Sequence, residues 1–152
     1  MGIIAVARCD REVRDRIAGF ATAAYPNEGC GVLIGARSGD AVAIVDATSG
    51  RNMVTDRRRD RYDLDPGDIV RADREARARG LDVVGIWHSH PDHPARPSAL
   101  DSNRAWIDYV YIICTAYAHG IGDCNAFTQT VESGPLEPLP LQVAPSAATG
   151  GG

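Results

Sequence analysis

The apolar positions in the first part of the chain change from strand spacing to helix spacing. An apolar run at residues 2–7 predicts a strand, and Asp10 is a favourable N-cap for the helix that follows. Tyr25-Pro26 ends that helix, because a residue before proline disfavours helical backbone angles. The apolar residues that recur at helical spacing between these limits are Val13, Ile17, Phe20, Ala21 and Ala24.

A hairpin and a polar connection are predicted next. The apolar runs at residues 31–34 and 41–45 are typical of strands, and Ser38-Gly39-Asp40 between them is typical of a turn. Residues 49–62 are polar and rich in arginine. Because charge runs are usually solvated, we interpret Arg57-Arg58-Arg59-Asp60-Arg61 as a loop rather than as a binding surface.

A second helix is indicated by signals at both of its ends. Asp65 can cap its N-terminus, and Pro66 suits the first helical position. Asp68 then favours the positive end of the helix dipole, and Gly80 can close the helix.

The rest of the chain alternates strands with one short helix. Residues 81–87 form an apolar run typical of a buried strand, and they lead directly into His88-Ser89-His90. Residues 91–97 contain three prolines, which predicts an extended loop. The elements expected after this loop are a short helix at residues 98–106 and strands at residues 109–115 and 124–130.

These elements predict one domain and its fold class. We expect the domain to cover residues 1–135, followed by a Pro- and Gly-rich tail over residues 136–152. Within the tail we expect an edge strand near residues 139–143 and disorder in the last ten residues. The pattern favours the α/β (α+β) class, with a mixed, mostly antiparallel sheet flanked by two or three helices, rather than a doubly wound fold.

Composition and charge restrict the location and the partners. No apolar run approaches the roughly 20 residues that cross a bilayer, and no secretory signal is recognisable, so we expect a cytoplasmic protein that does not bind membranes. The net charge of −4 provides no basic field for nucleic acid. All basic residues are arginines, so the chain offers no lysine for isopeptide modification. Whether the protein is a monomer or a homodimer stays open.

The cysteines do not form a metal or redox motif. Cys9, Cys30, Cys114 and Cys124 are widely separated, without a Cys-x-x-Cys pair, which excludes zinc-ribbon and thioredoxin-like sites. We expect Cys30 and Cys114 to be small buried side chains. A redox or inhibitory role for Cys30 is the alternative.

The paired histidines are the candidate metal site. Since His88 and His90 are two residues apart on an extended chain, their side chains lie on the same side of it. Asp101 follows a loop long enough to fold back, and two imidazoles with one carboxylate suit a zinc ion that keeps a fourth position for water. Alternatively, Asp101 belongs only to a helix-start box with Ser98 as the N-cap, which leaves the histidine pair unexplained.

Hydrolysis also requires a general base, and Glu28 is the candidate. It lies where the first helix gives way to a strand, and Gly29 and Gly31 beside it allow close approach of the backbone to a substrate. Because most glutamates are solvated surface residues, the local pattern alone does not decide this role.

Together these residues resemble the motif of the JAMM (MPN-plus) zinc metalloprotease family. Glu28, then His88-Ser89-His90-Pro91, then Ser98-Ala99-Leu100-Asp101 reproduce the family's glutamate, His-x-His, seven residues and Ser-x-x-Asp. The flanking sequences around Cys30 and Trp87 are similar to the small prokaryotic branch. The resemblance covers about residues 7–130 and implies the MPN fold, which is cytidine-deaminase-like.

The resemblance also implies roles for these residues and a substrate. His88, His90 and Asp101 would bind Zn²⁺, Glu28 would transfer protons and Ser98 would stabilise the oxyanion. Relatives cleave peptide or isopeptide bonds next to the C-terminal Gly-Gly of ubiquitin-like proteins, and small prokaryotic members act on sulfur-carrier proteins. We therefore expect a zinc metallopeptidase with this class of substrate.

Two alternatives come from other functional classes. One is a non-catalytic MPN scaffold that binds partners without metal, although such proteins have lost motif residues that this chain retains. The other is a different zinc hydrolase. Nucleoside deaminases require His-x-Glu and Pro-Cys-x-x-Cys, and thermolysin-type enzymes require His-Glu-x-x-His, none of which occurs in the sequence.

Overall fold

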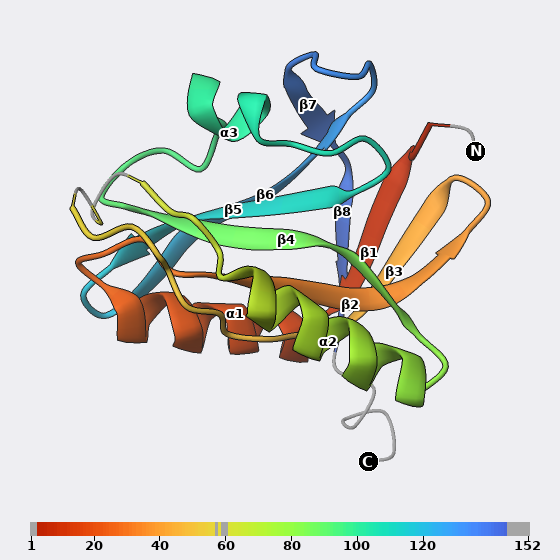
Figure 1. Ribbon diagram of the computed structural model, residues 1–152, viewed down its shortest axis with the longest axis horizontal. Coiled ribbons are helices and arrows are strands. Elements are labelled where there is room, and N and C mark those ends of the chain that lie inside the picture. The colour runs from red at the N-terminus through yellow and green to blue at the C-terminus, as the bar shows by residue number, and fades with distance from the viewer. Residues whose placement is uncertain (1–2, 57, 59–60, 146–152) are drawn as a thin grey trace.

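A computed structural model describes residues 3–56, 58 and 61–145, which form one curved sheet and three helices (Figure 1). The order of the eight strands in the sheet is β7-β6-β5-β4-β2-β3-β1-β8. The elements are β1 (Val6–Asp10), α1 (Arg11–Ala24), β2 (Cys30–Ser38), β3 (Ala41–Ala47), α2 (Pro66–Ala78), β4 (Asp82–Pro91), α3 (Ala99–Asn103), β5 (Val110–Tyr117), β6 (Gly120–Gln129), β7 (Leu136–Leu139) and β8 (Leu141–Ala144).

The sheet is mixed and mostly antiparallel, which confirms the predicted fold class. The antiparallel pairs are β2 with β3, β2 with β4, β5 with β6, and β6 with β7. The parallel pairs are β4 with β5, and β1 with both β3 and β8. Strand β4 therefore lies in the middle of the sheet, hydrogen-bonded on both edges.

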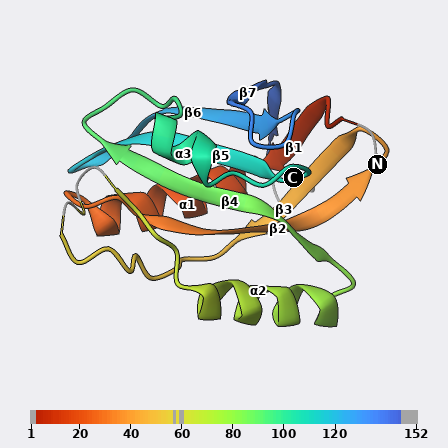
Figure 2. The same ribbon diagram turned by 45° about the horizontal axis from the view of Figure 1, so that its top comes forward.

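Two helices cover opposite faces of the sheet, and the side chains of β2 point alternately toward one helix and the other. Val32 and Ile34 point into the core beneath α2, whereas Leu33 between them points into the core beneath α1. This alternation follows from the two-residue repeat of a strand. Figure 2 shows α2 on the outside of the sheet, and the helix contacts β2 and β4. A strand buried on both faces makes a rigid base for side chains at its end.

Strands β7 and β8 bring the two edges of the sheet together. Leu139 pairs with Ala126 of β6, and Leu141 pairs with Ala7 of β1, at the opposite end of the strand order. Only Pro140 separates them, and its carbonyl accepts a hydrogen bond of 3.0 Å from the amide of Ala7. Since two residues span only about 7 Å, the sheet must curl until its edges meet.

Several predicted element boundaries differ from those in the structure. The first strand covers Val6–Asp10 rather than residues 2–7, and the histidine pair lies inside β4 rather than after it. Residues 136–144, expected in a tail with one edge strand, form two strands of the sheet. Most of the expected disordered end, residues 146–152, lies outside the described residues, as does most of the arginine run.

The helix signals were more accurate than the strand boundaries. Asp65 caps α2 by accepting a hydrogen bond of 2.9 Å from the amide of Gly67. Asp10 is the N-cap of α1, but its side chain makes no capping hydrogen bond. Gly80 follows α2 with a φ of +72°, a left-handed backbone angle that glycine adopts readily. No helix among the described residues is long and apolar enough to cross a membrane.

Candidate functional site

The histidine pair lies at the end of the central strand. His88 pairs with Cys30 of β2 and with Ile113 of β5, so the backbone at this point is held from both sides. His90 lies two residues further along the same strand. Both rings therefore project from the same side of a rigid strand, as the spacing predicted.

Glu28 reaches the histidines because β2 and β4 are antiparallel. The start of one antiparallel strand lies beside the end of the other, and Glu28 comes two residues before β2. Its backbone is fixed on both sides, since its amide donates to the carbonyl of Arg58 at 2.6 Å and its carbonyl accepts from Asn52 Nδ2 at 3.3 Å. Glu28 as a whole is only 4% exposed. A carboxylate is thus held in a shielded position beside two imidazoles.

Asp101 is placed by a short helix that folds back over the strand. Ser98 is the N-cap of α3, and its Oγ accepts a hydrogen bond of 3.1 Å from the amide of Asp101. In return, Asp101 Oδ2 accepts from the amide of Ser98 at 2.8 Å. The helix-start box and the metal-site hypothesis are therefore compatible, because the capped helix orients the carboxylate.

The distances fit a tetrahedral metal ion better than direct hydrogen bonds. Asp101 Oδ2 lies 3.3 Å from His88 Nε2 and 3.4 Å from His90 Nε2. A hydrogen bond between a charged nitrogen and a carboxylate is about 2.7–2.9 Å. Two ligands of a tetrahedral zinc with bonds of about 2.0–2.1 Å are about 3.3–3.4 Å apart. The donors are spaced as they would be around a shared ion.

A second acid also approaches the histidines. One ligand atom each from Glu28, His88 and His90 all lie within 4.8 Å of one another. Two carboxylates therefore lie beside the histidine pair. The motif resemblance implies that Asp101 binds the metal and that Glu28 transfers protons.

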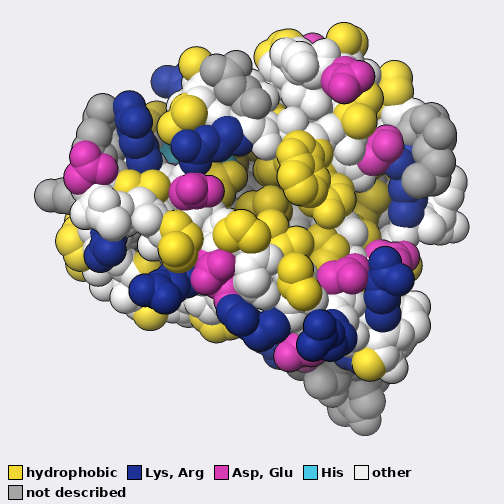
Figure 3. All heavy atoms as spheres, in the orientation of Figure 1, with side chains coloured by type: hydrophobic (Ala, Val, Ile, Leu, Met, Phe, Trp, Pro, Cys, Tyr) yellow, Lys and Arg dark blue, Asp and Glu magenta, His cyan; other side chains and the backbone are white. Residues whose placement is uncertain are grey.

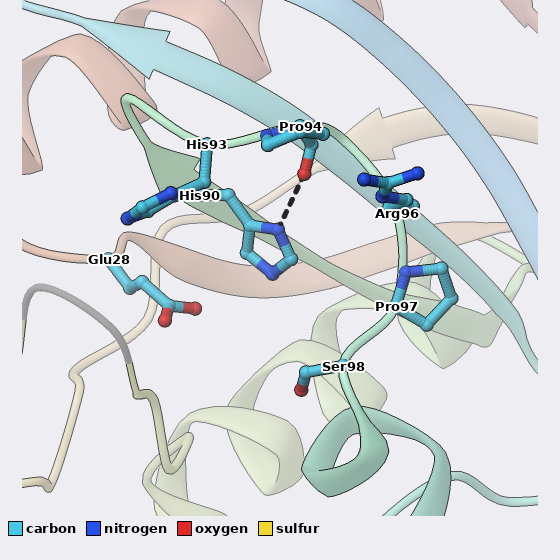
Figure 4. A pocket seen from close by; sticks show the side chains of 7 residues that line it. All are labelled: Glu28, His90, His93, Pro94, Arg96, Pro97 and Ser98. Carbon is cyan, nitrogen blue, oxygen red and sulfur yellow. Dashed lines mark hydrogen bonds between the residues drawn. The ribbon is translucent and has the colours of Figure 1, made fainter.

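His90 is oriented by the loop that follows it. Its Nδ1 lies 2.9 Å from the carbonyl oxygen of Pro94 (Figure 4). A carbonyl only accepts, so Nδ1 carries a hydrogen, and in the neutral form of the ring the lone pair of Nε2 faces the site. Metal-binding histidines are commonly fixed in this way.

His88 is fully buried and has no such partner. Neither of its ring nitrogens makes a hydrogen bond within the described part of the chain, although Nε2 faces Asp101. Its ring stacks on Tyr62, with centroids 4.3 Å apart. Burial lowers the pKa of His88, against the opposing effect of Asp101, so the ring is neutral. Orphaned buried nitrogen atoms are costly, and a metal ion would satisfy Nε2.

The remaining pKa shifts favour a ligating carboxylate. Burial alone would raise the pKa of Asp101, but the two histidines and the amide of Ser98 depress it well below its usual range. Burial alone would lower the pKa of His90, but Asp101, the Pro94 carbonyl and the charge of Glu28 raise it. The carboxylate is therefore ionised, as a metal ligand must be.

A pocket of about 270 Å³ opens beside these residues. Figure 4 shows Glu28 and Arg96 on opposite sides of His90, with Ser98 below. His93 is exposed and also lines this pocket. In Figure 3 only a small area of histidine surface is visible, and arginine side chains border it.

Arg96 belongs to none of the motifs in the sequence. The arginine stands in the proline-rich loop between the histidines and Ser98, and only the folding of that loop over the strand brings it to the pocket. Its position between two catalytic motif segments was the one available signal. The expected burial of Cys30 and Cys114 is confirmed, and burial raises the pKa of the Cys30 thiol to about 12, which disfavours the reactive thiolate.

Comparisons with known proteins agree with this geometry. The family model described as prokaryotic homologs of the JAB domain matches residues 10–129. The desampylase of Haloferax volcanii is 41% identical over 91 residues, which are 59% of this chain and 63% of the desampylase. The match therefore spans less than two thirds of that relative.

Solved structures support the same fold. A Salinibacter ruber protein shares 32% identity with a TM-score of 0.71, over 92% of each chain. A Desulfitobacterium hafniense protein shares 26% identity with a TM-score of 0.80, over 93% of this chain and 94% of that one. A JAB1/MPN domain protein from Archaeoglobus fulgidus, at 20% identity and a TM-score of 0.52 over 89% and 98% of the two chains, shows the fold alone.

The family match covers most of the chain, including every residue of the histidine, aspartate and glutamate motif. It agrees with the motif resemblance and with the mixed sheet. This chain is a member of the family of prokaryotic homologs of the JAB domain.

Proposed function

We propose that this protein is a zinc-dependent peptidase. Its substrate is the peptide or isopeptide bond that follows the C-terminal Gly-Gly of a ubiquitin-like or sulfur-carrier protein. The observation that carries the proposal is the convergence of His88 Nε2, His90 Nε2 and Asp101 Oδ2 at 3.3–3.4 Å, with the shielded carboxylate of Glu28 beside them. The similarity to a desampylase supports the substrate class.

In the proposed mechanism the metal would be held by His88, His90 and Asp101. A zinc ion bound there would polarise the substrate carbonyl and lower the pKa of a water molecule toward about 7. Its charge would be balanced by Asp101 and ionised Glu28, which suits a site shielded from solvent.

Glu28 moves the proton in this mechanism. Its carboxylate accepts a proton from the attacking water and later delivers that proton to the nitrogen of the leaving amine. The fixed backbone on both sides of Glu28 keeps the carboxylate in position for both transfers.

Ser98 stabilises the developing charge. Because its Oγ already accepts a hydrogen bond from the amide of Asp101, its hydroxyl hydrogen is available for another acceptor. It donates to the substrate oxygen as the carbonyl carbon becomes tetrahedral. Loss of one such donor typically costs about 100- to 1,000-fold in rate.

The test combines metal analysis with cleavage of defined substrates. Purified protein should contain about one zinc per chain. The zinc-loaded enzyme should cleave ubiquitin-like or sulfur-carrier proteins extended beyond Gly-Gly, and Glu28→Gln should retain zinc while losing about 100- to 10,000-fold in rate. Equal rates for the wild type and Glu28→Gln, or a folded protein that binds no zinc, would contradict the proposal.

A further inference from the structure

We propose that Arg96 determines substrate specificity by binding a free α-carboxylate on the residue that is released. The preferred substrate would then be a linear chain with a single residue after the scissile bond, rather than an isopeptide conjugate. This inference rests on the proposed peptidase function and deepens it.

Glu28 lines two separate hollows in the protein surface. The pocket of about 270 Å³ contains His90, Arg96 and Ser98, and a larger one of about 470 Å³ is lined by the end of α1, residues 49–52 and Arg58. Glu28 is the residue that both linings share. Within this proposal, the two sides of the scissile bond lie in the two hollows, and the released residue lies in the one that contains Arg96.

Arg96 is mounted on a backbone that is fixed relative to His90. The carbonyl of Pro94 accepts a hydrogen bond of 2.9 Å from the amide of Arg96, and the same oxygen contacts His90 Nδ1. The next carbonyl, that of Ala95, accepts a bond of 3.0 Å from Asn125 Nδ2 of β6. The arginine therefore projects from a loop that is tied both to the site and to the sheet.

The charge of Arg96 is available to a ligand. Its side chain is exposed at the pocket, and no carboxylate within the described ranges forms an ion pair with it. A guanidinium binds a carboxylate through two parallel hydrogen bonds, which gives both strength and direction.

The position of a terminal carboxylate matches this arrangement. In a released C-terminal residue, the α-carboxylate carbon is three covalent bonds from the scissile carbonyl carbon. In an isopeptide, the lysine methylene chain occupies that place. A cation beside the site therefore strengthens binding of the linear substrate and does not strengthen binding of the isopeptide.

The larger hollow also contains arginines, and substitutions of those arginines serve as the control. Arg58 Nε donates to the carbonyl of Val54 at 2.5 Å, so part of its guanidinium is already engaged. The backbone of Arg51 is bound by Asp68 Oδ2 at 2.7 Å. If the released residue occupied the larger hollow, these arginines and not Arg96 would hold its carboxylate.

The experiment compares matched substrates. A carrier protein ending in Gly-Gly is extended by one alanine, either with a free carboxylate or as the C-terminal amide, and kcat/KM is measured for both with zinc-loaded enzyme. The wild type should prefer the free acid by about 10- to 100-fold. Arg96→Gln should bring the ratio of the two rates close to one, and Arg96→Lys should restore part of it.

A binding measurement keeps the test independent of turnover. In the Glu28→Gln background, calorimetry should show tighter binding of the acid than of the amide, and adding Arg96→Gln should remove that difference. Arg51→Gln and Arg58→Gln should both keep the preference. The inference is overturned if the wild type does not distinguish acid from amide, if Arg96→Gln keeps the ratio, or if either control removes it. Failure of the proposed function would instead appear as no cleavage of any substrate.

Discussion

The Oγ of Ser89 accepts a hydrogen bond of 2.8 Å from the amide of Gly29, and the amide of Ser89 donates at 3.0 Å to the carbonyl of Gly29. Ser89 stands between the two candidate metal ligands and, by strand alternation, points away from them. Gly29 directly follows the candidate base. This double contact fixes the distance between the histidine strand and Glu28.

Removing the Ser89 hydroxyl should therefore weaken both fold and site. Ser89→Ala leaves the buried amide of Gly29 without its side-chain acceptor, which should lower the free energy of unfolding by about 1–3 kcal/mol. Urea unfolding measures this loss. Ser38→Ala, at the exposed end of β2, is the control and should stay within about 0.5 kcal/mol of the wild type. Equal stability of the two variants would show that the contact contributes nothing.

Gly31 is required by a close approach of the backbone. A Cβ there would lie 1.8 Å from the carbonyl oxygen of Thr48 and 2.4 Å from Trp87 Nε1. Those two atoms form a hydrogen bond of 2.8 Å, which the methyl group would break. We expect Gly31→Ala to destabilise by about 3 kcal/mol or more, measured by thermal unfolding.

Gly19 provides the matched control for Gly31. It lies within α1, and nothing approaches its Cβ position within 4 Å. Gly19→Ala should therefore stabilise by about 0.5–1 kcal/mol, because alanine favours a helix. Similar effects at the two positions would mean that the crowding at Gly31 is relieved by small movements.

The two roles of Asp101 can be separated. Asp101→Asn keeps an oxygen that can accept from the amide of Ser98 but loses the charge, so it should preserve α3 and weaken zinc binding by more than about 100-fold. Ser98→Ala should keep zinc and lower stability by about 0.5–2 kcal/mol through loss of the cap. Zinc titration against a competing chelator checks both. Unchanged affinity in Asp101→Asn would instead indicate that Glu28 and the histidines hold the ion.

Asp46 should give the protein a measurable pH dependence. It joins both long helices to β3, since it forms ion pairs with Arg16 of α1 and, at 2.8 Å, with Arg79 at the end of α2. Burial alone would raise the pKa of Asp46, but Arg79, the amide of Ala47 and Arg16 lower it below 3.8. This stabilisation is complete above the unfolded value and disappears as the pH falls through the folded one.

The variant Asp46→Asn should accordingly be less stable than the wild type near neutral pH, by about 1 kcal/mol or less, because the pairs are largely solvated. The difference should shrink as the pH falls below the unfolded pKa of Asp46 and vanish once the carboxyl of the folded protein is protonated. Urea unfolding at several pH values measures it. A difference that persists in acid would point to shape or hydrogen bonding rather than charge.

Much of the local structure could be predicted from neighbouring residues. The caps at Asp65 and Ser98 and the stop at Tyr25-Pro26 act within one helical turn, so they are legible in the sequence. The placement of His88 and His90 on one side of a strand follows from the two-residue repeat alone. The fixed spacing of the motif then indicated that Glu28, Ser98 and Asp101 belong to the same site.

Other features depend on residues that are distant in the sequence. The first strand was predicted in the wrong place. The limits of Val6–Asp10 are set by pairing with β3 and β8 rather than by the apolar residues of the strand itself. The splitting of residues 136–144 into two strands depends on both free edges of the sheet being available. Strand pairings of this kind produce no periodic pattern in the sequence of the segment itself, so they could not be predicted from it.

The chemical features of the site fall into the same two groups, those set by short segments and those set by tertiary packing. The residue types, their spacing and the helix cap of Asp101 are properties of short segments, because backbone angles and capping act over a few residues. The 3.3–3.4 Å separations, the burial that keeps His88 neutral and the approach of Arg96 arise only when β2, β4 and the proline loop pack together. Distances and desolvation are collective properties of the packed chain, and no single segment specifies them.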